Sequence, residues 1–388
     1  MKSVLGAVLA LLASGAPALA APQGLELRFC PSAQVRTYPL ESRRAIEGLL
    51  LQNVAVINRG AAPVSLDAIS IELLRGGETV DARTLDGSDI ARIADRGAKY
   101  QAAGLVAAVP FQFCGTDMIG AGVKLAGPSL ATGEAMLVMQ QAFAFQGARD
   151  TLRVRVEAIS NGKPVEATAT IPIVTGLSKN TYRFPLRGIW YAGVGPTFHT
   201  GHRWALPEEF AFDIAKLDAG GRTYRNDGTK FPDYYAYGAE VLAAADGRVI
   251  AAENAQEENP DMMRKPGETQ DAYAARVQQN QAGLLAKGTS GIAGNYVMID
   301  HGTGEYTLYA HMQPGSVRVH PGDQVKAGDV IGRLGSSGNS TEPHLHFQLC
   351  DRPDPLMCAG IPITFSGIEI PWADYPRPLQ SGDVVVAQ

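Results

Sequence analysis

The chain has 388 residues, of which 45% are hydrophobic and 19% are charged, and its formal net charge at pH 7 is -5. This length suggests two domains with ample core, and an acidic balance without a basic block argues against nucleic acid as a partner. All seven histidines lie between residues 199 and 346. Histidine is the commonest metal ligand and a frequent general base near neutral pH. Their clustering therefore predicts a functional site in the second half of the chain.

Residues 1–20 have the pattern of a secretory signal peptide. Lys2 supplies a positive start, residues 4–13 are apolar, and residues 18–20 form a small-x-small cleavage site. The apolar run is too short to span a membrane, and no other stretch is long and apolar enough to do so. We therefore expect a mature chain that begins near Ala21, has no integral membrane segment, and is periplasmic or secreted.

Four cysteines in an exported chain suggest two disulfides. Cys350 and Cys358 would close a small loop in the last quarter of the sequence, which leaves Cys30 and Cys114 to each other. Metal ligation by cysteine is the alternative, but the sequence contains no C-x-x-C motif.

Residues 21–175 are predicted to form a β domain. Strand patterns occupy residues 49–57, 65–74 and 165–174, and residues 152–158 alternate apolar with charged side chains. Between them, Ser88 is a candidate N-cap for one helix. Short strands with turn signals and one helical insertion predict an immunoglobulin-like β-sandwich. No motif here carries chemistry, so we expect a packing or adaptor domain.

A second β-rich domain is expected at residues 181–388, after a linker near residues 175–180. It contains a long polar insertion at residues 253–294, in which Thr269 is a candidate cap for a helix that ends near Lys287. A long insertion in a compact domain is often a lid or a binding loop, and a surface decoration is the alternative.

The run Pro343-His344-Leu345-His346-Phe347 has the alternation of a β-strand. Side chains two apart share one strand face about 6.6 Å apart, so both imidazoles would face one metal or substrate. A catalytic zinc ion keeps three protein ligands and one open position. Asp213, on a second apolar strand, offers a carboxylate that would be costly to bury unpaired. His199 and His202 lie in the loop before it.

Several motifs follow one another in the order found in one family. They are His202 with Asp213, then residues 245–249, residues 296–302, Tyr309-Ala310-His311, residues 321–332, and residues 335–347. On these motifs the second half of the chain resembles the lysostaphin-type (LytM-type) zinc metallopeptidases, which cut peptide bonds in bacterial cell walls. The resemblance implies a mainly β protein whose C-terminal domain is a β-sandwich or barrel.

The resemblance also implies roles for individual residues. It assigns Zn²⁺ to His202, Asp213 and His346, and catalysis to His311 and His344. His199 is a rival to His202, because ten residues separate His202 from Asp213 where many relatives have only a few. Two neutral imidazoles and one carboxylate would leave the ion with a net positive charge, which favours ionisation of a water molecule.

We therefore expect an exported, monomeric zinc metalloendopeptidase that acts on peptidoglycan peptides. One alternative is a catalytically silent or latent wall-binding module that regulates other hydrolases. Another is a sugar-uptake carrier that uses paired histidines for phosphoryl transfer, although the signal peptide disfavours it. Of the remaining motif residues, His301 is expected to be structural and His320 exposed, while Asn339 and Thr341 are expected to line the cleft.

Overall fold

The computed structural model of the chain describes residues 24–388 except 110–111, 115–117, 121 and 198–200. Strands predominate over helices, which confirms the mainly β fold class. The predicted signal peptide and His199 both lie outside the described residues. Within the described part, no helix combines the length and apolar character needed to cross a membrane.

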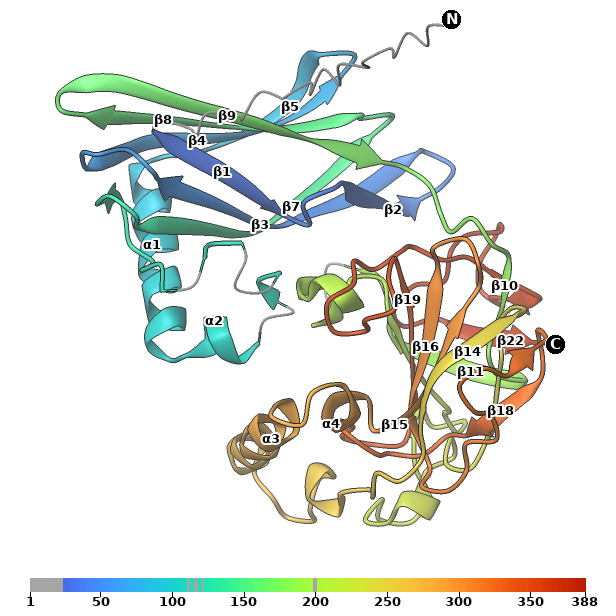
Figure 1. Cartoon of the computed structure of the whole chain (residues 1–388). Coiled ribbons are helices and arrows are strands. Elements are labelled where there is room, and N and C mark those ends of the chain that lie inside the picture. Colours follow the sequence, from blue (N-terminus) through green and yellow to red (C-terminus); the bar gives the residue numbers. More distant parts are fainter. Residues whose placement is uncertain (1–23, 110–111, 115–117, 121, 198–200) are drawn as a thin grey trace, which may run out of the picture.

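The N-terminal half contains a nine-stranded sheet folded into two layers that stack on each other (Figure 1). The layers join where β2 pairs in parallel with β9, and a hydrophobic core that includes Leu49 and Val154 fills the space between them. One layer holds β1 (Leu25–Cys30), β2 (Val35–Glu41), β3 (Ile46–Asn58) and β7 (Ala135–Gln146); the other holds β4 (Val64–Arg75), β5 (Glu78–Leu85), β6 (Ser129–Leu130), β8 (Thr151–Ser160) and β9 (Lys163–Val174). The immunoglobulin-like assignment stays a prediction.

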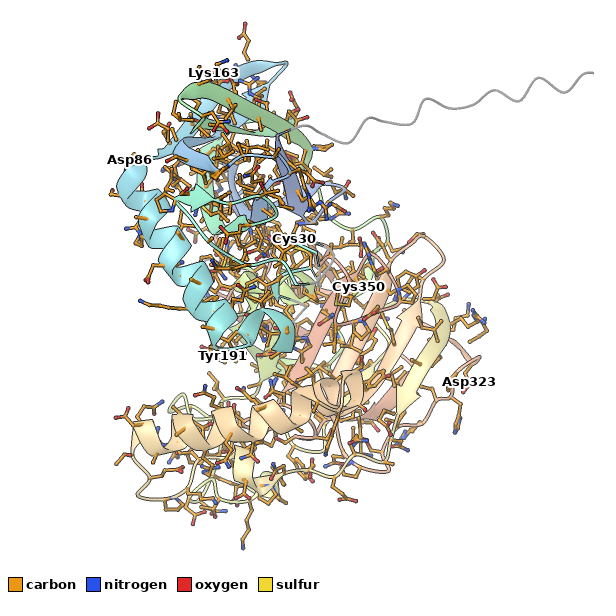
Figure 2. All side chains as sticks on the ribbon, turned by 60° about the vertical axis from the view of Figure 1, so that its left-hand side comes forward. Cys30, Asp86, Lys163, Tyr191, Asp323 and Cys350 are labelled. Atoms are coloured by element: carbon orange, nitrogen blue, oxygen red, sulfur yellow. A yellow bond between two sulfur atoms is a disulfide. The ribbon has the colours of Figure 1, made fainter. Side chains whose placement is uncertain are left out.

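The first helix, α1 (Gly87–Ala102), is followed by the short α2 (Leu105–Ala108). The predicted cap at Ser88 is wrong, because Asp86 is the N-cap and accepts hydrogen bonds from the backbone N–H groups of Ser88 and Asp89. Figure 2 labels Asp86 at this end of the helix. An acidic side chain at an N-cap satisfies free N–H groups and also interacts favourably with the helix dipole.

The C-terminal half is built on a second nine-stranded sheet, of order β17-β14-β15-β16-β19-β12-β11-β22-β21. Its terminal strands, β17 and β21, have two residues each and do not pair with each other, so the described sheet is open and the barrel alternative is wrong. The strands of this half are β10 (Tyr182–Arg183), β11 (Gly188–Val194), β12 (Phe212–Ala215), β13 (Glu240–Leu242), β14 (Gly247–Glu253), β15 (Asn295–Asp300), β16 (Tyr306–Met312), β17 (Gln324–Val325), β18 (Val330–Arg333), β19 (Leu345–Cys350), β20 (Phe365–Ser366), β21 (Ile368–Glu369) and β22 (Val384–Ala387).

The insertion at residues 253–294 is partly helical, as predicted. It contains η5 (Pro260–Met262), α3 (Gln270–Leu285) and α4 (Thr289–Ala293). Thr269 caps α3 by accepting a hydrogen bond from the backbone N–H of Ala272 at 3.2 Å, which confirms the predicted cap. The other short helices of this half are η2 (His202–Trp204), η3 (Leu206–Glu208) and η4 (Phe231–Asp233).

Both predicted disulfides are present. Cys30 pairs with Cys114 and Cys350 with Cys358, with Cα atoms 5.8 and 5.5 Å apart. Figure 2 shows Cys30 and Cys350 near the boundary where the two halves meet. Each half has a separate sheet, which is compatible with the predicted division near residues 175–180; that division stays a prediction.

Candidate functional site

Two neighbouring strands bring the first predicted site residues together. In β12 and β19, Phe212 and Phe347 face the hydrophobic core. The antiparallel register sets Asp213 directly opposite His346. Residues opposite each other in such a pair project from the same face of the sheet. The alternation that buries the phenylalanines therefore points the carboxylate and the imidazole to the other side.

His202, which begins η2, completes a cluster with Asp213 and His346. Its Nε2 lies 3.3 Å from Asp213 Oδ2, while His346 Nδ1 lies 3.0 Å from Asp213 Oδ1. One ligand atom from each of the three residues falls within 4.8 Å of the others. Zinc binds imidazole nitrogen and carboxylate oxygen at about 2.0–2.2 Å, so these three atoms can share one ion and leave a further position open.

Gln348 orients the ring of His346. The Oε1 atom of Gln348 lies 2.8 Å from His346 Nε2, and its Nε2 donates to the carbonyl oxygen of Pro355 at 2.9 Å. An amide oxygen can only accept, so His346 carries its proton on Nε2 and presents an unprotonated Nδ1 to the cluster in its neutral form. Metal-binding histidines commonly have such an outer partner.

His311 reaches the same site through an irregularity in β16. Simple alternation after Tyr309, which faces the core, would turn His311 to the core as well. The ladder between β15 and β16 is shifted at this point, and His311 has a φ of 63°. Positive φ is uncommon for residues other than glycine, and a bulge of this kind re-aims a side chain. Ala310 and His311 consequently both line the site cavity.

The loop at residues 335–343 fixes the rings of His311 and His344. His311 Nδ1 lies 2.8 Å from the carbonyl oxygen of Ser337, and His344 Nδ1 lies 2.7 Å from that of Glu342. Since a carbonyl only accepts, each Nδ1 carries the proton, and each neutral ring has its lone pair on Nε2. The ring centroids are 4.8 Å apart. The two rings thus offer a pair of proton-accepting atoms next to the cluster.

The cluster is strongly coupled by charge. Burial opposes ionisation of Asp213, but the histidines around it outweigh this effect and hold the pKa of Asp213 well below its usual value. Burial likewise opposes protonation of His346, yet the hydrogen bond and charge of Asp213 raise its pKa to about 9. For His311 burial dominates and lowers the pKa well below its usual value. A bound cation would displace protons from the ligands of this site.

All five predicted residues line one cavity of about 280 Å³. Asn339 and Thr341 also line it, as predicted. The insertion, predicted to be a lid, a binding loop or a surface decoration, also lines the cavity through Gln281, Thr289 and Ile292, none of which was named from the sequence.

The two remaining described histidines lie outside this cavity. His301 is held between the carbonyl oxygen of Asp246 and the hydroxyl of Thr307, at 2.8 and 2.9 Å. The side chain of His320 is 84% exposed. Both observations agree with the expected structural and exposed positions.

The fold is mainly β, and His202, Asp213 and His346 form a candidate metal centre. Comparison with known proteins assigns part of the C-terminal half to a family. Residues 272–356 match the family model described as Peptidase family M23. The chain therefore carries a peptidase M23 (LytM-type) domain in this segment. The matched residues include His311, His344 and His346, whereas His202 and Asp213 precede them.

Two curated relatives are similar to part of this segment. The DD-carboxypeptidase/endopeptidase Mpg of Neisseria meningitidis serogroup B is 48% identical over 73 residues, which is 19% of this chain and 16% of that protein. The peptidoglycan DD-endopeptidase ShyA of Vibrio cholerae serotype O1 is 42% identical over 76 residues, 19% of this chain and 17% of that protein. The chain thus matches only about a sixth of the length of these relatives.

Among solved structures, the catalytic domain of the prophage-encoded M23 protein EnpA from Enterococcus faecalis matches with a TM-score of 0.27 and 18% identity. The match covers 47% of this chain and 93% of that chain.

Proposed function

We propose that the protein is an exported, monomeric zinc metalloendopeptidase that hydrolyses peptide bonds in peptidoglycan. The observation that carries this proposal is the convergence of His202, Asp213 and His346 beside His311 and His344 in one cavity. The M23 domain supports a peptidase, and relatives named as peptidoglycan endopeptidases support the substrate class. Two disulfides are compatible with an oxidising compartment outside the cytoplasm.

Zn²⁺ would be held by His202, Asp213 and His346. Bound there, it would supply a Lewis acid that polarises a peptide carbonyl and makes water more acidic. The chain contributes the shape of the site: Gln348 holds the ring of His346, and the strand register holds Asp213 opposite it.

His311 and His344 would move the protons of the reaction. Each ring is anchored through Nδ1–H, so proton exchange takes place at Nε2. A neutral ring can accept the proton of the attacking water, and a protonated ring can stabilise the developing oxyanion or donate to the leaving amine. Two rings fixed side by side can divide these tasks.

A wall-digestion assay tests the proposal. The purified exported protein is incubated with cell-wall sacculi, with and without a chelator, and the released fragments are identified by mass spectrometry. We expect peptide-bond cleavage that stops with chelator and returns with Zn²⁺, and about one zinc ion per chain. Digestion that persists in His346→Ala, or a protein without bound metal, would falsify the zinc-hydrolase proposal.

A latent form of the enzyme is the second candidate, because the insertion lines the cavity at Gln281, Thr289 and Ile292. Replacing residues 265–287 with a glycine-serine linker removes α3 but keeps α4. If the insertion restrains the site, this variant digests sacculi faster than the full chain while its zinc content is unchanged. Equal or lower digestion by the variant argues that α3 does not block the site.

A further inference from the structure

The ten residues between His202 and Asp213 are called here the connector (residues 203–212), and two of them pack against the N-terminal half. Leu206 belongs to a buried cluster that otherwise consists largely of N-terminal residues such as Ile57. The ring of Phe210 stacks on that of Tyr38, with centroids 6.0 Å apart. The segment that joins two of the proposed metal ligands is therefore held in part by the half that has no described histidine.

A buried ion pair joins the first residue of the connector, Arg203, to Glu209. Arg203 Nη1 lies 3.0 Å from Glu209 Oε1, and the two side chains are 1% and 5% exposed. Burial raises the pKa of Glu209 to about 7, against the effect of Arg203. A buried pair loses the hydration of both charges, so its geometry depends on additional hydrogen bonds.

Gln52, in β3 of the N-terminal half, holds the connector by a hydrogen bond to its backbone. Its side chain is fully buried, and its Nε2 donates to the carbonyl oxygen of Arg203 at 2.8 Å. The Gln52 amide also lies near the carboxylate of Glu209, where it opposes the rise in the pKa of that carboxyl. Gln52 thereby fixes the backbone at the residue directly after His202.

The ring of His202 depends on this backbone more than the other site histidines depend on theirs. Among the described residues, its buried Nδ1 has no hydrogen-bond partner. By contrast, Gln348 orients His346, and a carbonyl group orients His311. The position of a ring without such a hydrogen bond is determined mainly by the backbone to which it is attached. The position of Arg203 therefore largely sets where His202 Nε2 lies.

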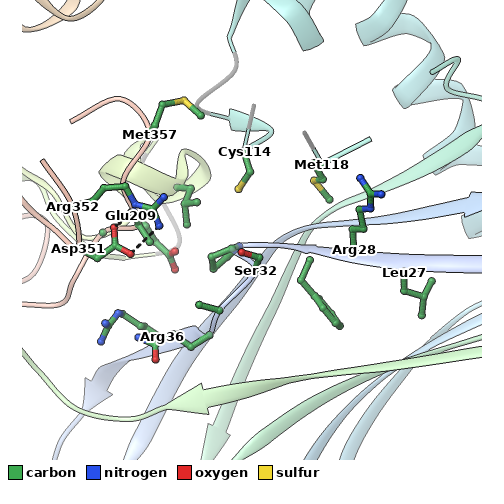
Figure 3. Close-up of a pocket in the computed structure, with 17 residues that line it drawn as sticks. Leu27, Arg28, Ser32, Arg36, Cys114, Met118, Glu209, Asp351, Arg352 and Met357 are labelled. Carbon is green, nitrogen blue, oxygen red and sulfur yellow. Dashed lines mark hydrogen bonds and ion pairs between the residues drawn. The ribbon is translucent and has the colours of Figure 1, made fainter. Parts of the chain in front are cut away.

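Packing around the connector is incomplete on one side. A cavity of about 580 Å³ lies between the halves, and Glu209 is among the residues that line it (Figure 3). Where Glu209 borders this cavity, van der Waals contacts with other side chains constrain it less than in a close-packed core. The directional hydrogen bond from Gln52 to the backbone of Arg203 consequently contributes more to the position of the connector.

We propose that Gln52 is a positioning residue for the metal centre, through which the N-terminal half sets the place of His202. The inference rests on the proposed function, since it takes His202 as a metal ligand. Removing an outer partner of a metal ligand commonly weakens metal binding by about 10- to 100-fold. Gln52 contacts the residue after His202 and not the ring itself, so we expect loss of its amide to weaken Zn²⁺ binding by about 10-fold, the lower end of that range.

The test measures Zn²⁺ affinity of the full-length exported chain by competition with a chromophoric chelator. Gln52→Met keeps the side-chain length but removes both N–H donors. Asn53→Ala is the matched control, because Asn53 is also buried on β3 but donates to the carbonyl oxygen of Gln112 within the N-terminal half. Gln52→Asn, one methylene shorter, is a milder variant in case Gln52→Met does not fold. The visible spectrum of the Co²⁺-loaded protein reports the coordination sphere directly.

The proposal is supported if Gln52→Met or Gln52→Asn weakens Zn²⁺ binding and alters the Co²⁺ spectrum while Asn53→Ala does neither. It is overturned if the Gln52 variants bind Zn²⁺ as the unaltered chain does. Equal weakening by Asn53→Ala also overturns it, because the effect would then come from general loss of stability. An unaltered chain that binds no metal overturns the proposed function and this inference together.

Discussion

Each half of the molecule contains a buried or partly buried carboxylate surrounded by cationic groups, and the two differ in kind. Glu72 in the N-terminal sheet accepts hydrogen bonds from Arg153, Arg155 and Thr79. Asp213 in the C-terminal sheet faces His202, His344 and His346 instead. The pKa of each carboxyl is lowered, since these partners outweigh the effect of burial. The direction of a pKa shift therefore does not distinguish a structural ion pair from a site.

The chemistry of the partners does distinguish them. Arginine keeps its proton at all ordinary pH values and has no lone pair for a metal ion. The positive charges of the arginines therefore compensate the Glu72 carboxylate permanently. Histidine can lose its proton and then present a lone pair, so the Asp213 cluster can exchange protons for a metal ion. A carboxylate surrounded by histidines can therefore bind a metal cation together with them. A carboxylate surrounded by arginines is already neutralised and has no neighbouring lone pair to help bind a metal.

The largest effect is expected when alanine replaces each of these two carboxylates in turn, because only one of them is a proposed metal ligand. Asp213→Ala removes a proposed ligand, so we expect Zn²⁺ binding and wall digestion to fall to background while the fold is retained. Glu72→Ala should leave Zn²⁺ affinity unchanged and lower the free energy of unfolding by about 1.5–3 kcal/mol, the range for a hydrogen bond to a charged group. Zinc titration and urea unfolding of both variants measure this contrast. Retained zinc binding in Asp213→Ala would contradict the proposed ligand set.

The next effect tests whether the histidines divide into ligands and proton-transfer groups. His311→Ala and His344→Ala should lower turnover on sacculi by about 10²- to 10⁴-fold, the usual contribution of a general acid or base. Their bound zinc should remain close to one ion per chain. His320→Ala is the control, because its side chain is 84% exposed and remote from the cavity lining. Loss of metal from His311→Ala or His344→Ala would show that the division is wrong.

A smaller effect is expected at Gln348, which holds His346. Gln348→Leu removes the acceptor for His346 Nε2, and we expect Zn²⁺ affinity to fall by about 10- to 100-fold. Gln348→Glu keeps an acceptor at that position and should bind Zn²⁺ nearly as the unaltered chain does. Chelator competition measures both. If Gln348→Leu binds as well as Gln348→Glu, the hydrogen bond does not orient the ligand.

Sequence patterns predicted the parts of the site that regular strands position. Strand alternation was sufficient to place Phe347 in the core with His346 on the opposite face, and it also indicated the strand that carries Asp213. The family resemblance supplied His311, which alternation alone would have turned to the core. Its position depends on a bulge with positive φ, and no residue type in that stretch signals one.

Contacts between distant segments could not be predicted in the same way. Gln52 lies in the middle of an apolar strand, 151 positions before Arg203, and nothing in either local pattern pairs them. The contacts of the insertion with the cavity could not be predicted either, because local sequence predicts a helix but not the surface against which that helix packs. Local propensity is short-ranged, whereas these contacts arise only when both halves have folded.

The smallest expected effect concerns the junction between the insertion and the loop that anchors the two histidines proposed to be catalytic. Glu258 Oε1 accepts a hydrogen bond from the backbone N–H of Ser336 at 2.8 Å, and Tyr237 donates to its other oxygen at 2.8 Å. Ser336 precedes Ser337, whose carbonyl holds His311. Glu258→Ala should lower turnover roughly fivefold, as expected for about 1 kcal/mol, with zinc affinity unchanged because this contact does not involve the proposed ligands. Glu258→Gln keeps the acceptor for Ser336 and should approach full turnover; equal losses in both variants would indicate that the charge, and not the anchored loop, matters.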